Sequence, residues 1–101
     1  MAQEATEVAD NPAASRLEAR VGNQLAYAAY EIAPGTITFT HTLVPEPLRH
    51  HGIATALVEA GIELARSRGL KIVPLCPFFK SYFAGHPQLA SLLAPSAAPA
   101  P

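Results

Sequence analysis

Three stretches in the first half of the chain alternate between apolar and polar residues, as half-buried β-strands do. They are residues 16–21, 24–32 and 36–43. Two short segments separate them, Gly22-Asn23 and Pro34-Gly35. Both pairs are typical of tight turns, because glycine and asparagine accept positive φ and proline presets φ at −65° or so. The pattern therefore predicts an antiparallel meander of three strands.

The clearest alternation lies in the third stretch, residues 36–43. Ile37, Phe39, His41 and Leu43 share one predicted face, and four threonines share the other. A single histidine on an apolar face is most often a hydrogen-bonded core residue. The pattern alone thus places His41 in the core beside Ile37 and Phe39.

The period of the pattern changes after the Pro45-Glu46-Pro47 segment. Apolar and small residues then recur on one side of a predicted helix, at Ala54, Leu57, Val58, Gly61, Ile62 and Ala65. Gly69 is expected to end this helix, and residues 70–75 form a short apolar strand. A strand–helix–strand order predicts parallel strands joined by a right-handed crossover. We therefore expect an α/β fold with a mixed sheet, one long crossover helix, and short helices at 78–83 and 87–93.

Both ends of the chain lack this periodicity. Residues 1–15 show neither strand nor helix spacing, and residues 94–101 consist of alanine, proline and serine. Such segments bury too little apolar surface to offset their ordering entropy. We expect disordered tails at 1–15 and 94–101 and a single folding unit at 16–93.

Charge and cysteine content narrow the possible partners. The net charge is −1 and charged residues make up 15% of the chain, so no basic stripe is present to follow a nucleic-acid backbone. No apolar run approaches the length of a membrane span. One cysteine, Cys76, cannot form an internal disulfide, which suits a reducing compartment. We expect a cytoplasmic monomer that binds neither nucleic acid nor membrane.

The turn before the long helix contains the most informative residues. Gly52 and Ala54 are small residues at the point where the helix begins, and Arg49 precedes them. A helix N-terminus offers unpaired N–H groups and a partial positive charge, and both favour phosphate binding. A glycine at such a turn is also common for close packing alone, so the turn by itself leaves both interpretations open.

The spacing Arg-x-x-Gly-x-Ala after an alternating strand resembles the pyrophosphate motif of the GNAT N-acetyltransferase superfamily. Here Arg49, Gly52 and Ala54 carry that motif. Three flanking stretches, at residues 41–46, 74–78 and 86–87, resemble a compact single-domain subgroup of small acetyltransferases. The resemblance covers residues 16–93 and implies a GNAT-like sheet whose two parallel strands splay apart.

The resemblance implies an acetyl-CoA-dependent N-acetyltransferase that acts on a small amine or a lysine. It implies a cofactor site made of Leu43, Val44, Arg49, His50, His51, Gly52, Ile53, Ala54 and Thr55. His50 and His51 are bulkier than the residues many relatives carry there, so their side chains are expected to point away from the phosphates. A CoA-binding module without turnover and a cysteine-based thioesterase are the alternatives.

Three residues are candidates for catalysis, and each has a structural alternative. Cys76 follows a parallel strand, where ligands gather in open α/β sheets, and is either a nucleophile, a pocket-lining group or a core residue. Tyr82 matches a tyrosine that protonates the leaving thiolate in many relatives, or it anchors its short helix. His41 is a base or a core residue. No metal-ligand spacing is present, so no metal is expected.

Overall fold

The molecule is built on a five-stranded sheet, and this computed structural model describes residues 7–49 and 52–95. The strands lie side by side in chain order: β1 (Val8–Asn11), β2 (Arg16–Val21), β3 (Gln24–Ala33), β4 (Thr36–Leu43) and β5 (Lys71–Pro74). All neighbours are antiparallel except β4 and β5, which are parallel. The other elements are α1 (Ile53–Arg68), α2 (Pro77–Ala84) and the 3-10 helices η1 (Pro12–Ala14), η2 (Glu46–Leu48) and η3 (Pro87–Leu92). The predicted meander followed by a βαβ unit is confirmed.

The predicted turns and helix end lie where the pattern placed them. Two-residue loops join β2 to β3 and β3 to β4, with Gly22 and Gly35 at φ 60° and 79°. Gly69 ends α1 in the left-handed conformation, and its N–H donates to carbonyl groups of the last helical turn. Among the residues that the structure describes, no helix is both long and apolar enough to cross a membrane.

The sheet starts earlier than the pattern predicted. Residues 8–11, which we expected in a disordered tail, form β1 and pair with β2 along the edge of the sheet. Polar contacts tether this strand: Asp10 accepts a hydrogen bond from Tyr30, and Asn11 donates one to Glu18. A four-residue strand held in this way has no apolar alternation for a sequence pattern to reveal. Residues 1–6 lie outside the described range.

The packed unit also extends slightly beyond its predicted end. Leu93 and Ala94 are buried, and the Ala94 N–H donates to the Ile72 carbonyl at 2.8 Å. The chain after η3 thus lies against the free edge of β5. The remaining part of the predicted tail, residues 96–101, is not described.

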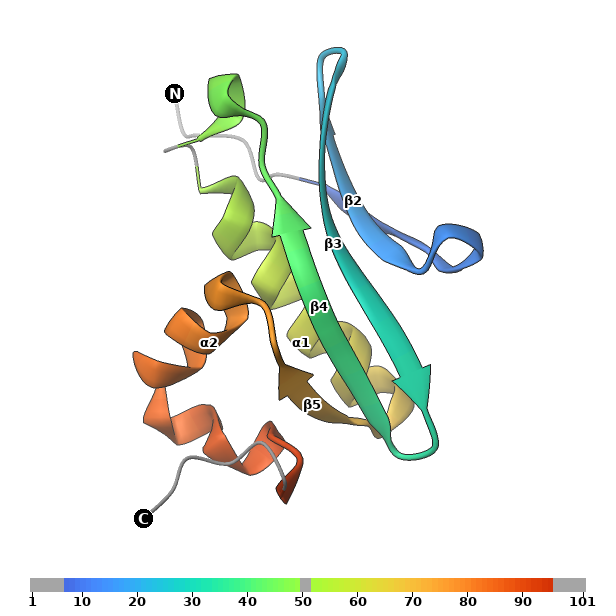
Figure 1. Cartoon of the computed structure of the whole chain (residues 1–101), viewed down its shortest axis with the longest axis vertical. Coiled ribbons are helices and arrows are strands. Elements are labelled where there is room, and N and C mark those ends of the chain that lie inside the picture. The colour runs from blue at the N-terminus through green and yellow to red at the C-terminus, as the bar shows by residue number, and fades with distance from the viewer. Residues whose placement is uncertain (1–6, 50–51, 96–101) are drawn as a thin grey trace.

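Both α-helices pack on the same face of the sheet, which we call the helix face (Figure 1). Phe39 from β4 stacks on Phe79 from α2, with ring centroids 4.1 Å apart and planes 10° from parallel. Gly61 of α1 lies against both rings, where a side chain would have no room. Other strand side chains complete this core, among them Leu17, Ala19, Ala26, Ala28 and Ile37. We call the opposite face of the sheet the open face.

A β-bulge in β4 reverses the predicted facing of its second half. Phe39 pairs with Tyr30 and His41 pairs with Ala29, so Thr40 is an extra residue without a partner across the ladder. Before the bulge, Ile37 and Phe39 are buried on the helix face. Beyond it, His41 and Leu43 are exposed, and the expectation that they share the buried face is wrong.

Candidate functional site

Among the residues that the structure describes, no side chain caps the N-terminus of α1. Its first position outside the helix is Gly52, in the left-handed conformation at φ 78°, and no acidic residue lies in the first turn. The first intrahelical hydrogen bond runs from the Ala56 N–H to the Gly52 carbonyl at 3.0 Å. The preceding amides, those of Ile53, Ala54 and Thr55, therefore face outward at the positive end of a 16-residue helix. This arrangement suits an anion.

Arg49 lies in the segment between β4 and α1. Its Nε donates to the Val44 carbonyl at 3.0 Å, which ties the side chain to the end of the strand. The residue is exposed, and its terminal nitrogens have no hydrogen-bond partner among the described residues. The guanidinium group thus adds positive charge next to the helix N-terminus, in a position to form charge-assisted hydrogen bonds.

Two adjoining cavities lie along this end of the molecule. The first, of about 310 Å³, is lined by Val44, Leu48, Arg49, Gly52, Ile53, Ala54, Thr55 and Phe78. The second, of about 180 Å³, is lined by Ala54, Thr55, Val58, Phe78, Ser81 and Tyr82. The two cavities adjoin, since both are lined by Ala54, Thr55 and Phe78, and we call them together the α1–α2 groove.

The groove contains most of the residues predicted to bind the cofactor. Val44, Arg49 and the α1 residues from Gly52 to Thr55 line it. Leu43 lies outside its lining and is exposed on the open face. His50 and His51 fall outside the described residues. Phe78 was not predicted, although an aromatic residue beside Pro77 at the start of a helix was a signal available in the sequence.

The pairing between β4 and β5 ends halfway along β4. It covers Thr36 to Phe39 only, and the Phe39 carbonyl then accepts the N–H groups of both Leu75 and Cys76 at 3.1 and 3.0 Å. After these contacts the chain turns away into α2. On its β5 side, the part of β4 beyond the bulge therefore pairs with none of the described strands, as expected for two splayed strands. Backbone groups there are available to an extended ligand.

Cys76 lies just inside this open end, on the helix face. It is fully buried, and its Sγ donates to the Thr42 Oγ1 at 3.0 Å. Thr42 faces inward because of the bulge, so the strict alternation had placed it with the other threonines and concealed this contact. The side-chain bond joins β4 to the start of α2 just beyond the last backbone pairing.

Tyr82 lies on α2, with its side chain on the wall of the groove. Its hydroxyl donates to the Glu59 Oε2 of α1 at 3.2 Å, and its ring stacks on His86. Partial burial raises the pKa of the Tyr82 phenol, and the charge and hydrogen bond of Glu59 raise it further. The phenol therefore stays protonated over a wide pH range.

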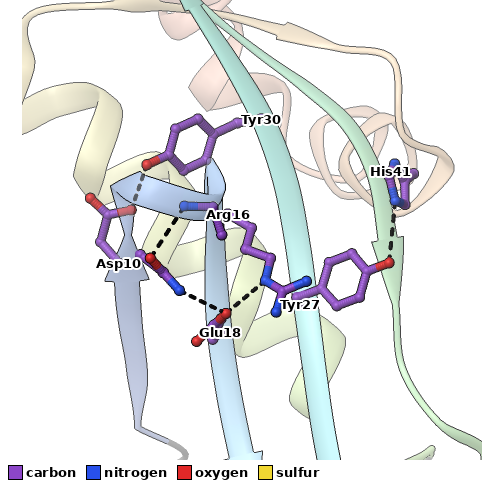
Figure 2. A network of polar contacts seen from close by, with 8 residues as sticks. Asp10, Arg16, Glu18, Tyr27, Tyr30 and His41 are labelled. Atoms are coloured by element: carbon purple, nitrogen blue, oxygen red, sulfur yellow. Dashed lines mark hydrogen bonds and ion pairs between the residues drawn. The ribbon is translucent and has the colours of Figure 1, made fainter.

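His41 is exposed on the open face, where its ring points toward Tyr27 (Figure 2). The Tyr27 hydroxyl is 3.4 Å from its Nε2, and the two rings meet edge to face. Arg16 packs over the Tyr27 ring at 4.7 Å and forms an ion pair with Glu18 at 2.6 Å. Hydrogen bonds from Arg16 and Asn11 lower the pKa of Glu18. No motif marked this cluster in the sequence, because its members come from four different strands.

The candidate residues thus occupy two sides of β4. The groove, Cys76 and Tyr82 are on the helix face, and His41 is on the open face. Among the residues described, no three histidine, cysteine, aspartate or glutamate side chains are grouped so that they could hold a metal ion.

A protein-family model described as GCN5-related N-acetyl-transferase matches residues 16–92. The chain belongs to this family. The match spans the sheet from β2 onward, both α-helices and η3, and it contains the motif residues Arg49, Gly52 and Ala54. A search of curated proteins found no match.

Membership of the GCN5-related N-acetyltransferases supports an acyltransferase function in general. The family also agrees with the mixed sheet and with the open end between β4 and β5. The catalytic roles of Cys76, Tyr82 and His41, like the individual cofactor contacts, stay predictions.

Proposed function

We propose that this protein is an acetyl-CoA-dependent N-acetyltransferase whose acceptor is a small amine or an exposed lysine. The observation that carries the proposal is the uncapped N-terminus of α1, which opens into the α1–α2 groove. Apart from the neighbours of Gly52 in the chain, no described residue has a heavy atom within 4 Å of the position that a Cβ on Gly52 would occupy, which leaves room for a phosphate to approach the amides. Arg49 supplies a cation beside the same opening.

The groove suits CoA in its chemistry as well as its position. The N-terminus of α1 favours the diphosphate of CoA. Val44, Leu48 and Phe78 offer apolar surface to the uncharged pantetheine arm. The unpaired side of β4 offers backbone groups to the two amides of pantetheine, as an added strand would. When bound, acetyl-CoA supplies the acetyl group as a thioester.

The two sides of β4 suggest separate roles in the transfer. An amine that approaches from the open face meets His41, which accepts a proton as the new C–N bond forms. The C–S bond breaks on the other side, and Tyr82 donates its proton to the departing thiolate. A backbone N–H from the unpaired end of β4 stabilises the negative charge on the carbonyl oxygen. The products are the acetylated amine and free CoA.

A CoA-binding module without turnover is the second candidate. It is favoured by the Tyr82 hydroxyl, which donates to Glu59 instead of pointing to an open site. A cysteine-based thioesterase fits less well, because Cys76 is fully buried. We also propose that the protein acts as a monomer.

Two measurements separate these functions. Acetyl-CoA at 100 times its Kd should stabilise the fold by about 2.7 kcal/mol and raise the melting temperature by several degrees. Release of free CoA should then be followed with a thiol reagent, with and without a panel of amines. Release that needs an amine indicates the acetyltransferase, release without one indicates the thioesterase, and stabilisation without release indicates the module. Absence of any thermal shift at millimolar acetyl-CoA contradicts all three.

A further inference from the structure

Two residues with no role so far hold the phenol of Tyr82. Glu59 of α1 accepts a hydrogen bond from the Tyr82 hydroxyl at 3.2 Å, and the His86 imidazole stacks on the ring with centroids 4.1 Å apart and planes 14° from parallel. We propose that Glu59 and His86 are positioning residues that orient the Tyr82 phenol in the groove for proton donation. This inference rests on the proposed function, because it takes Tyr82 as the proton donor.

His86 is itself fixed to the end of α2. Its Nδ1 lies 2.7 Å from the Tyr82 carbonyl, and because a carbonyl only accepts, Nδ1 carries the proton. The His86 backbone N–H donates to the Phe83 carbonyl at 3.2 Å. One bond thus holds the imidazole against the Tyr82 ring and the other holds the His86 backbone, while Phe83 meets that ring edge to face at 6.4 Å. These contacts hold the ring of Tyr82 but leave its O–H bond free to rotate about the C–O bond.

Glu59 holds the O–H of the Tyr82 phenol through a hydrogen bond. Its carboxylate accepts the single O–H of Tyr82 and would lie next to a phenolate if that proton were lost early. The titratable or charged groups that face the phenol are Glu59 from α1 and His86 from the segment after α2. When a thiolate forms in the groove, the O–H turns toward it and the proton moves from Oη to sulfur. The phenolate then recovers a proton from solvent.

The chain offers a matched control for Glu59. Glu63 lies one turn further along α1, is also exposed, and its side chain forms no hydrogen bond with any residue that the structure describes. Replacement of either glutamate by glutamine removes the same charge from the same helix. Only Glu59→Gln removes it from beside the phenol.

The direct test follows ionisation of the Tyr82 phenol by ultraviolet absorbance, as a difference from Tyr82→Phe. Glu59→Gln should lower the pH at which Tyr82 ionises, and Glu63→Gln should leave it unchanged. A phenol with a lower pKa loses its proton at a lower pH and then cannot act as donor. The fall of kcat at alkaline pH should therefore begin at a lower pH in Glu59→Gln. KM for acetyl-CoA should change little, because the carboxylate does not line the groove.

The second test removes the stacked ring. His86→Ala should lower kcat by about 10- to 100-fold with little change in KM, since small displacements of a catalytic group are costly. His86→Phe keeps a ring under Tyr82 and should recover most of that loss, which also guards against a general loss of fold.

The results that overturn the inference are distinct from those that overturn the proposed function. An unchanged Tyr82 ionisation in Glu59→Gln, or an unchanged kcat in His86→Ala, overturns the positioning roles alone. Full turnover in Tyr82→Phe overturns the donor role and this inference with it. A wild-type protein that neither binds nor uses acetyl-CoA overturns the proposed function, whatever the ionisation measurement shows.

Discussion

The Tyr30 hydroxyl donates to the Asp10 carboxylate at 2.6 Å, across two strands of the sheet (Figure 2). Tyr30 is almost fully buried on the helix face, and Arg68 from the last turn of α1 lies 3.5 Å from the other oxygen of Asp10. The three side chains join β3, the edge strand β1 and the C-terminus of α1. Asp10 therefore adds a side-chain attachment of β1 to the core, beside its backbone pairing with β2.

Tyr30→Phe should lower the free energy of unfolding by about 1.5 kcal/mol, because it removes a hydrogen bond to a charged group and keeps the ring. For a domain of this size the melting temperature should fall by roughly 5–10 °C. Tyr27→Phe, on the open face, is the control and should have a smaller effect. Equal losses in both variants, measured by urea unfolding, would contradict the special role of Asp10.

The same contact predicts a dependence on pH. Burial first, and then the hydrogen bond and charge of Asp10, raise the pKa of Tyr30 from 10.0 to about 12. A group whose pKa is raised in the folded state stabilises the fold below its unfolded pKa and loses that effect as pH rises through the folded value. The stability difference between wild type and Tyr30→Phe should hold up to pH 10 and shrink between about pH 10 and 12. A difference that is unchanged at pH 12 would show that the contact does not persist in solution.

Gly61→Ala should destabilise the protein although alanine favours helices. A Cβ at Gly61 would lie 2.8 Å from Phe39 and 3.0 Å from Phe79, inside a stacked pair that is fully buried. Overpacking of this kind costs about 1–3 kcal/mol, more than the gain of up to about 1 kcal/mol in helix propensity. Gly85→Ala is the control, because its nearest contacts are at 3.7 Å. A Gly61→Ala protein that melts at or above the wild-type temperature refutes the packing argument.

Gly52→Val should abolish CoA binding, and Gly69→Val should not. Both glycines are left-handed residues at opposite ends of α1, and, chain neighbours aside, neither has an atom of a described residue within 4 Å of the Cβ position. Each substitution therefore strains the backbone by about 1–2 kcal/mol or more. Only at Gly52 does the added side chain occupy the mouth of the groove. If calorimetry shows that both variants bind CoA equally, the turn is structural only.

Cys76→Ala should retain CoA binding and most turnover, because the buried thiol donates to Thr42 and does not line the groove. Incubation of wild type with acetyl-CoA should leave the intact mass unchanged. An added acetyl group on Cys76 that disappears at the turnover rate when an amine is supplied would instead identify a covalent nucleophile.

The elements of this fold differ in how far the sequence reveals them. The alternation in β2 and β3 and the one-sided stripe from Ala54 to Ala65 predict strands and a helix, because burial of an apolar face dictates their period. β1 escaped prediction because polar tethers such as that of Asp10 hold it. The bulge at Thr40 escaped prediction because an extra residue in one strand depends on the register with its neighbour.

The residues of the candidate site also differ in how far the sequence predicts them. Arg49, Gly52 and Ala54 form a local motif, and the structure places them on one groove as the spacing indicated. Contacts between distant segments, such as Thr42 with Cys76 and Tyr82 with Glu59, have no signature in spacing. They follow from the crossover of α1 and from the bulge, both of which are tertiary features.

The bulge at Thr40 also bears on how this domain changes over evolutionary time. Beyond it, consecutive residues of β4 project to opposite sides, so His41 and Leu43 can be exchanged without disturbing the bond between Thr42 and Cys76. Under the proposed function, variation at Leu43 would alter which amine is accepted and leave the groove for CoA intact, whereas variation at His41 would also remove the proposed base. Loss of the extra residue would have the opposite effect: it would invert the end of the strand and remove both properties in one step.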